Sequence, residues 1–235
     1  MIPGAPVARQ LPLGISLRPG ASFDAYFSGG NGLAVAVLQR MAEGAGERQT
    51  WLAGAAGLGK SHLLQAACHA AARHGRRPAY LPLADETGLQ AGMLEGLEAL
   101  DLVCLDGIEA IVGDEDWELA LFNLINAARS EGARLLLASR QTPAHLEVRL
   151  PDLASRLAWG AVLQLVPPTD AQTRDALCER ARSLGLELPP AAADYLQRHF
   201  GRDLAGQLQR LEVLDRASLA AGRRLTVPFI KEVLG

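Results

Sequence analysis

The chain has 235 residues, of which 49% are hydrophobic, enough to bury a core in one large domain or in one ordinary domain with a small partner. Its 23 Lys and Arg and 26 Asp and Glu give a formal net charge of -3, which excludes a general attraction to nucleic acid or anionic lipid. The three cysteines contain no CxxC pair, and early prolines break the apolar run that a signal peptide needs, so we expect a cytoplasmic protein without a membrane segment.

Beyond a Pro- and Gly-rich leader that reaches to about Gly20, short apolar runs alternate with helical patterns as far as residue 166. The apolar runs are typical of buried strands, and the segments between them repeat apolar residues at intervals of three and four. We expect strands over residues 51–53, 79–83, 102–105, 135–138 and 162–166, and helices over 32–42, 60–74, 116–130 and 151–157. This alternation predicts an α/β fold with a parallel sheet flanked by helices.

The character changes at Pro167-Pro168, after which no strand pattern remains. Glycine and proline divide the rest into helices expected over residues 170–185, 190–201, 202–222 and from 226 onward. Asp170 and Thr226 are suited to cap the first and the last of these, and Pro190 lies just inside the second. We therefore expect a flexible leader over 1–20, an α/β base domain over 21–167 and a small all-α lid domain over 168–235.

A glycine-rich phosphate-binding loop lies between the first expected strand and the helix at 60–74. It consists of Gly54, Ala55, Ala56, Gly57, Leu58, Gly59, Lys60 and Ser61, and we count the adjacent His62 with it. The glycines let backbone amides face the phosphates, Lys60 reaches the β and γ oxygens, and the Ser61 hydroxyl can bind Mg²⁺. The strand and helix on either side argue against a chance match, so we expect a site for a purine nucleotide, ADP or ATP.

The partner of such a loop is an apolar strand that ends in an acid, and the run over residues 102–106, Leu-Val-Cys-Leu-Asp, fits it. Asp106 is therefore the expected magnesium ligand, directly or through water. Hydrolysing proteins of this class carry a second acid at the next position, but here it is Gly107. Glu109 lies two residues further on and is expected to point elsewhere, so we predict nucleotide binding with slow hydrolysis.

These residues resemble AAA+ ATPases of the bacterial replication-initiator group, and more closely the Hda family of DnaA-homologous regulatory inactivators of DnaA. The similarity extends over nearly the whole chain, in segments that occur in the expected order: residues 10–13, 23–31, 54–61, 102–109, 150–157, 215–218 and 225–232. It implies an AAA+ base domain followed by a helical lid.

The segment over 150–157 implies, by this resemblance, an arginine finger that reaches a nucleotide held by a neighbouring subunit, and Arg156 is the matching position. A guanidinium supplied from outside neutralises charge on the transferred phosphoryl group and is worth roughly 10³ to 10⁵ in rate. Spacing alone favours a simpler interpretation, in which Asp152 and Arg156 pair at i and i+4 on a helix surface. The resemblance favours the finger.

Two further nucleotide contacts are implied by the resemblance. Arg202, at the start of the third lid helix, matches the second sensor arginine, by which the lid touches the nucleotide; the alternative is a solvated residue in a first helical turn, where a cation is unfavourable. Asn31, with Phe23 and Tyr26 before it, resembles the adenine-side segment, although these aromatics can equally belong to the core.

The first sensor departs from the family pattern. An acidic or amide residue is usual after the strand expected at 135–138, whereas this chain has Ser139, Arg140 and Gln141. Ser139 or Gln141 can substitute for it. Together with Gly107, the departure favours a resting nucleotide-bound form, in which the resemblance implies ADP.

In the leader, Gln10, Leu11, Pro12 and Leu13 resemble the short peptide by which many replication proteins bind the sliding clamp, the beta subunit of DNA polymerase III. The glutamine can hydrogen-bond at a rim, the leucines can fill apolar pockets, and the proline lowers the ordering cost. An edge strand is the alternative, because apolar residues alternate through residue 17. The placement near a terminus favours docking.

The resemblance thus implies a negative regulator of replication initiation that binds the clamp and a nucleotide and supplies Arg156 to the ATP-loaded DnaA initiator. The rivals are a helicase loader or DnaA-like initiator with its own ATP cycle, and an inactive P-loop scaffold. The chain ends at Gly235 without a helix-turn-helix domain or basic stripe, so we expect DNA contact to be indirect, through the clamp. Side-by-side packing of AAA+ surfaces also allows homo-oligomers.

Overall fold

A computed structural model describes residues 17–84, 88–200 and 204–235 of the chain. The expected clamp peptide, Gln10 to Leu13, and the expected sensor Arg202 lie outside these ranges. No helix within the described ranges is long and apolar enough to cross a membrane.

Five parallel strands form the central sheet, in the order β2-β3-β4-β1-β5. They are β1 (Gln49–Ala53), β2 (Pro78–Pro82), β3 (Leu102–Asp106), β4 (Arg134–Ser139) and β5 (Ala161–Gln164). β1, β3 and all but the first residue of β4 are buried, which explains why these strands read as continuous apolar runs rather than as alternating ones. The expected α/β fold with a parallel sheet is confirmed.

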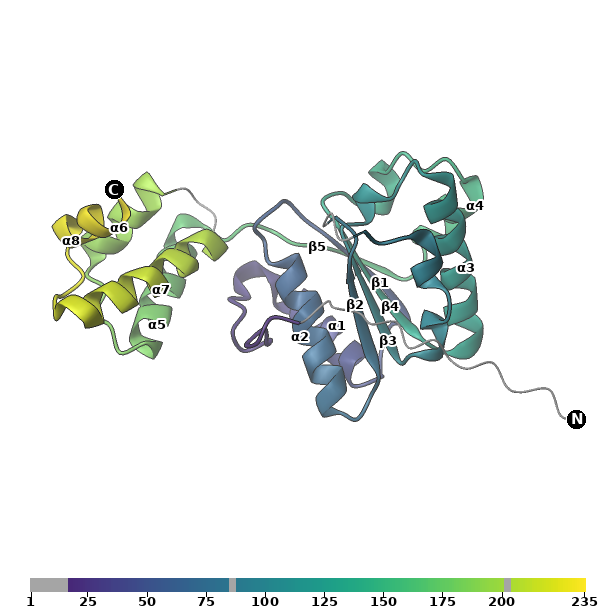
Figure 1. The fold of residues 1–235 in the computed structure, drawn as a ribbon, viewed down its shortest axis with the longest axis horizontal. Helices are drawn as coiled ribbons and strands as arrows, with labels where there is room; N and C mark the ends of the chain where they lie inside the picture. Colours follow the sequence, from purple (N-terminus) through teal and green to yellow (C-terminus); the bar gives the residue numbers. More distant parts are fainter. Residues whose placement is uncertain (1–16, 85–87, 201–203) are drawn as a thin grey trace, which may run out of the picture.

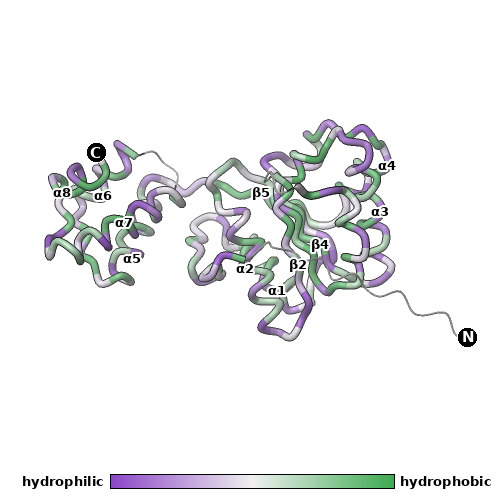
Figure 2. The backbone as a smooth tube through the Cα atoms, in the orientation of Figure 1, coloured by the Kyte–Doolittle hydropathy of each residue, from purple (hydrophilic) through white to green (hydrophobic). Residues whose placement is uncertain are grey.

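Helices cover both faces of the sheet (Figure 1). On one face, α1 (Gly32–Ala42) and α2 (Lys60–Arg73) pack in a cluster with Leu52, Cys104 and Leu136. On the other, α3 (Glu115–Glu131) and α4 (Pro151–Leu157) pack with Trp51 and Leu137. In Figure 2 the hydrophobic colour is concentrated along the strands between these two layers. Five short 3₁₀ helices complete the described part of this domain: η1 (Gly29–Asn31), η2 (Ala91–Leu94), η3 (Leu97–Ala99), η4 (Ile108–Ala110) and η5 (Pro143–His145).

The lid is a separate group of helices, joined to the sheet domain by the segment that follows β5 (Figure 1). It contains α5 (Asp170–Ser183), α6 (Pro190–His199), α7 (Leu204–Ala221) and α8 (Val227–Leu234), which share one apolar cluster around Leu177, Leu196 and Leu211. The lid therefore has a core of its own, as the loss of strand patterns after residue 166 predicted.

The residues predicted at the starts of the lid helices are correct in two of three cases. Pro190 occupies the first turn of α6, and the Thr226 hydroxyl accepts the Phe229 amide at the start of α8. The prediction that Asp170 caps α5 is wrong, because Thr169 is the N-cap. Its hydroxyl accepts the Gln172 amide at 3.2 Å while the Gln172 side chain accepts the Thr169 amide at 2.9 Å, a reciprocal capping box.

Glu118 in α3 connects the elements of the α3 and α4 face. It is 2% exposed, and its carboxylate accepts the backbone amides of Gly113 at 2.8 Å, Arg149 at 3.0 Å and Leu150 at 2.8 Å. Burial raises the pKa of Glu118, but the amide hydrogen bonds outweigh it and hold the pKa below its usual value. Leu150 is the N-cap residue of α4, so this carboxylate holds the chain at the point where α4 begins.

Replacing Glu118 by alanine should lower the free energy of unfolding by about 2 to 4 kcal/mol, because three buried amides lose a charged acceptor. Urea denaturation measures this loss. Glu115, an exposed residue in the first turn of the same helix, provides the control, and Glu115→Ala should cost less than about 1 kcal/mol.

The stabilisation by Glu118 should also depend on pH. Since the folded pKa is lowered, the contribution is present above the ordinary glutamate pKa of about 4.3 and is lost as the pH falls through the folded value. Glu118→Gln should therefore lose stability less steeply below about pH 5 than the wild type does. Equal slopes for the two proteins would contradict this role.

Candidate functional site

The phosphate-binding loop joins β1 to α2 and depends on glycine. Gly57 and Gly59 have φ angles of 82° and 83°, in the left-handed region that other residues seldom adopt. A Cβ atom on Gly59 would lie 2.7 Å from the Tyr26 ring, so a side chain there is excluded by contact as well as by conformation. The loop that the sequence predicted is therefore formed, and Tyr26 packs against its last glycine.

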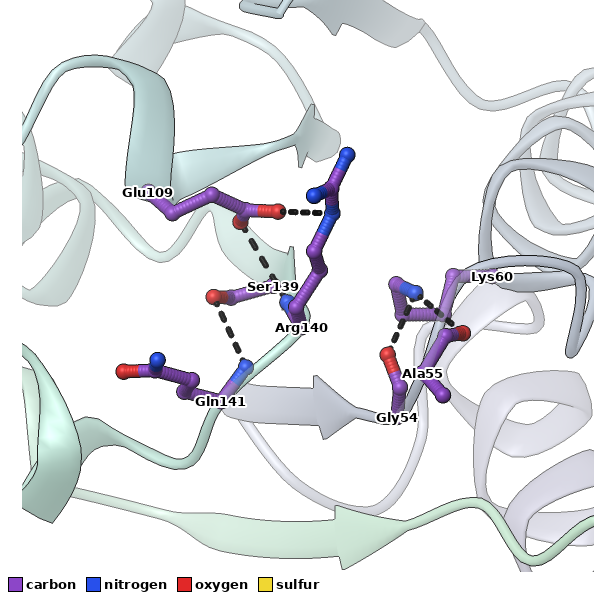
Figure 3. Close-up of polar contacts among 7 residues, drawn as sticks. All are labelled: Gly54, Ala55, Lys60, Glu109, Ser139, Arg140 and Gln141. Atoms are coloured by element: carbon purple, nitrogen blue, oxygen red, sulfur yellow. Dashed lines mark hydrogen bonds and ion pairs between the residues drawn. The ribbon is translucent and has the colours of Figure 1, made fainter.

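The loop offers donors for phosphate. The backbone amides of residues 55–62 donate to none of the residues that the structure describes. The Lys60 ammonium donates to the carbonyls of Gly54 at 2.6 Å and Ala55 at 2.9 Å, and Figure 3 shows it folded over the loop. Burial lowers the pKa of Lys60, while Asp106 and Glu109 raise it. Unpaired amides and a half-buried cation fit a polyphosphate.

Asp106, the expected magnesium ligand, ends β3 and is 9% exposed. Its Oδ2 accepts the hydroxyl of Tyr80, on the neighbouring strand β2, at 2.9 Å, while Oδ1 accepts nothing from the described residues. Burial and the Asp106 charge raise the pKa of Tyr80, while the nearby side chains of Gln65 and Ser61 lower it. The structure therefore brings Ser61 and Asp106 to the same hydroxyl, and this pair of oxygen donors fits Mg²⁺.

Tyr80 is a residue that the sequence did not reveal. Its position in β2 is two residues before Pro82, the register partner of Asp106. That strand pairing is not readable from local sequence. Tyr80 belongs to no recognisable motif, so the sequence around it did not indicate a role at the site.

Gly107, where related ATPases carry their second acid, has a φ of 83°. A Cβ atom there would lie 2.9 Å from the Cβ of Ala84 and 3.3 Å from its backbone nitrogen. In this backbone conformation, and packed against the segment after β2, position 107 has no room for an acidic side chain without movement.

Glu109 is engaged with Arg140, in the segment that follows β4. Its carboxylate lies 3.4 Å from the Arg140 Nε and accepts the Arg140 amide at 3.3 Å (Figure 3). Ser139 is buried, and its hydroxyl accepts the Gln141 amide at 3.2 Å, so the segment after β4 is tied to itself. A pocket of about 290 Å³ opens beside it, lined by Ala53, Arg140, Gln141, Thr142, His145 and Gln164. The identity of the first sensor stays a prediction.

Asn31 uses its side chain to hold the exit of β5. Its Oδ1 accepts the Val166 amide at 2.8 Å, and its Nδ2 donates to the Val166 carbonyl at 3.0 Å and to the Tyr26 hydroxyl at 3.2 Å. Tyr26 in turn donates to the Leu58 carbonyl at 3.1 Å. Hydrogen bonds therefore run from the phosphate-binding loop to the segment that leads to the lid. A nucleotide contact by Asn31 stays a prediction, as does one by His62, whose ring nitrogen lies 2.8 Å from the Ser22 carbonyl.

Arg156 lies in the last turn of α4, on the opposite face of the sheet from α2. Its Nε donates to Asn126 Oδ1 at 2.9 Å, and its guanidinium carbon lies 4.1 Å from the centre of the Trp159 ring and 5.7 Å from that of Phe122. The surface pair with Asp152 that spacing alone favours is not formed. Neither Nη nitrogen bonds to a residue in the described ranges.

Backbone contacts fix this arginine further. Gln49, the first residue of β1, donates from Nε2 to the carbonyls of Arg156 at 2.8 Å and Trp159 at 3.0 Å. Asn126 and Trp159 were not singled out from the sequence. Their roles depend on the packing of α3 beside α4, which no local sequence pattern predicts.

Solved structures define the class. The chain matches domain III of the replication initiation protein DnaA from Thermotoga maritima with a TM-score of 0.78 and 21% identity, over 94% of this chain and 98% of that one. AMPPCP-bound DnaA from Aquifex aeolicus matches with a TM-score of 0.74 and 24% identity, over 85% and 66%. The RuvB Holliday junction branch migration motor from Thermotoga maritima matches with a TM-score of 0.68 and 18% identity, over 93% of this chain and 72% of that one. The chain has the AAA+ fold that these DnaA domains share.

The sequence of the lid identifies its relatives more specifically than the fold does. Residues 170–234 match the family model described as Hda, lid domain. This match and the DnaA-like fold support the resemblance that the motifs indicated: residues 170–234 form a lid of the Hda type, and the chain as a whole has the fold of the DnaA AAA+ domains.

Replacing Gly107 by alanine should destabilise the protein by more than the same change at Gly75. Both glycines lie in the left-handed backbone region, with φ angles of 83° and 71°. A residue with a side chain loses about 1 to 2 kcal/mol in that conformation. Nothing lies within 4 Å of a Cβ atom at Gly75, whereas Ala84 obstructs one at Gly107. Chemical denaturation should give Gly107→Ala an additional loss of about 1 kcal/mol or more. Equal losses would show that Ala84 moves aside freely.

Proposed function

We propose that this chain is a negative regulator of chromosomal replication initiation. In this proposal it binds ADP, docks on the DNA-loaded sliding clamp, and stimulates hydrolysis of the ATP held by DnaA by supplying Arg156 in trans. The Hda lid match and the DnaA-like fold support the relation to DnaA. The remaining steps are supported by the arrangement of individual residues.

The observation that carries the proposal is the way in which Arg156 is held. Asn126 and the Trp159 ring fix the guanidinium on the surface of α3 and α4, while its Nη nitrogens make no bond to the described residues. A guanidinium that only stabilised its own helix would pair with Asp152. One that is oriented in advance loses little entropy when it meets a phosphate, which is what a finger requires.

In this proposal the nucleotide that the chain itself binds is a ligand to be held rather than a substrate to be turned over. The amides of the loop, Lys60 and Ser61 would hold the phosphates, and Asp106 with Ser61 would hold Mg²⁺, which supplies charge neutralisation when bound. AMPPCP is bound by one of the similar DnaA structures. Gly107 lacks the acid that orients water, and Glu109 is engaged with Arg140. These two features support slow hydrolysis and a long-lived bound form.

The principal rival is a loader or initiator that uses its own ATP cycle. The complete phosphate-binding loop is compatible with it, but the contact between Gly107 and Ala84 disfavours hydrolysis within this chain. An inactive scaffold is the third candidate. Turnover of ATP by the purified chain alone separates the first rival from the proposal.

Arg156→Ala should abolish the stimulation of ATP hydrolysis on DnaA, with a loss of roughly 10³ or more in the stimulated rate. The assay follows hydrolysis of ATP bound in advance to DnaA, in the presence of DNA-loaded clamp and the full chain. Asp152→Ala, an exposed change one turn earlier in α4, is the matched control and should leave the rate within about twofold.

Each result of that assay has a clear meaning. Stimulation that survives Arg156→Ala would remove the finger from the proposal. No stimulation by the wild type would favour the loader or the scaffold. Circular dichroism and nucleotide binding confirm that the variants remain folded.

Deletion of residues 1–15 should abolish binding to the clamp while nucleotide affinity stays within about twofold, because the expected peptide lies in the leader and the loop does not. Surface plasmon resonance on immobilised clamp measures the first quantity and calorimetry with ADP the second. A double change, Leu11→Ala with Leu13→Ala, should reproduce the deletion. Retained clamp affinity in either protein would refute the assignment.

A further inference from the structure

Two arginines share one indole on the face formed by α3 and α4. The guanidinium carbon of Arg129 lies 4.3 Å from the centre of the Trp159 ring, and that of Arg156 lies 4.1 Å from it. Arg129 belongs to the last turn of α3 and is exposed, whereas Arg156 is half-buried. Helices α3 and α4 pack side by side (Figure 1), and the two cations, from different helices, lie over the same ring.

Neither charge is neutralised by the described part of the chain. No carboxylate within it forms an ion pair with Arg129 or with Arg156. Like charges held this close repel each other, and the face of the indole offsets the repulsion only in part. An electropositive spot of this kind is complementary to an anionic surface.

The helix dipole explains only part of this arrangement. A cation in the last turn of α3 is favourable wherever it points, and Arg73 occupies the corresponding turn of α2. No aromatic ring among the described residues lies under Arg73, whereas Arg129 lies over the ring that Arg156 also uses. The position of Arg129 therefore calls for a second explanation.

We propose that Arg129 is a second partner-facing arginine, which attracts carboxylate side chains at the rim of the partner's nucleotide site while Arg156 enters that site. This inference rests on the proposed function, because it concerns the same surface. Carboxylates are chosen over phosphate because Arg129 is exposed, as a charge that meets a partner's surface is, whereas Arg156 is half-buried. An exposed rim charge acts mainly on the rate of association and its salt dependence.

The test measures the association of the full chain with ATP-loaded DnaA by stopped flow, from low ionic strength to about 0.15 M and above, where surface charges are screened. Arg129→Ala should lower the association rate constant about three- to tenfold at low ionic strength and flatten its salt dependence. At saturating concentration it should leave stimulated hydrolysis within about twofold, unlike Arg156→Ala.

Three comparisons make the result decisive. Arg73→Ala, the matched last-turn arginine on the other face of the sheet, should behave as the wild type. Arg129→Lys should retain most of the association rate, because it keeps the charge. Arg129→Glu should slow association more than Arg129→Ala does.

The inference is overturned if Arg129→Ala matches Arg73→Ala, or if Arg129→Lys falls as far as Arg129→Ala, which would indicate packing rather than charge. It is also overturned if the loss persists unchanged at high salt. A wild type that neither associates with DnaA nor stimulates it would instead defeat the proposed function, so the two failures are distinguishable.

Discussion

The arrangement of the α3 and α4 face depends on the hydrogen bonds that the Glu118 carboxylate accepts. One buried side chain of α3 accepts amides from the turn before α3 and from the two residues before α4. The position of α4 sets the position of Arg156, and the backbone of Arg156 is held again by Gln49. Rigidity at this face therefore comes from a buried charge that is fully solvated by the backbone, rather than from surface ion pairs, which are worth little.

The two faces of the sheet carry different chemistry. On the α2 side, the loop, Lys60 and Asp106 are suited to holding a nucleotide, and the close contact of Gly107 with Ala84 leaves no room for the residue that would activate water. On the α3 and α4 side, an arginine is oriented with its outer nitrogens unengaged within the described chain. In the proposed function these features belong together, because a protein that retains its own nucleotide can act on that of another.

The sequence predicted what depends on local pattern. The bounds of α1 and α4 are correct, and the loop, Asp106 and the parallel sheet were readable from glycine spacing, apolar runs and a terminal acid. The helix start at Thr169 was misassigned by one residue, although the spacing of Thr169 and Gln172 contains the capping-box signal. Tyr80, Glu118, Asn126 and Trp159 could not be predicted, because each acts across strands or helices that are distant in sequence.

The hydrogen bonds between Asn31 and Val166 define where the two domains can be separated. Both the amide and the carbonyl of Val166 are bonded to a residue of the base domain, and Asn31 is linked through Tyr26 to the loop at Leu58. Val166 is therefore part of the base domain, although it lies beyond the last strand. A chimaera that exchanges lids between relatives keeps these hydrogen bonds only if its junction falls after Val166, at the two prolines, where the chain has left the sheet.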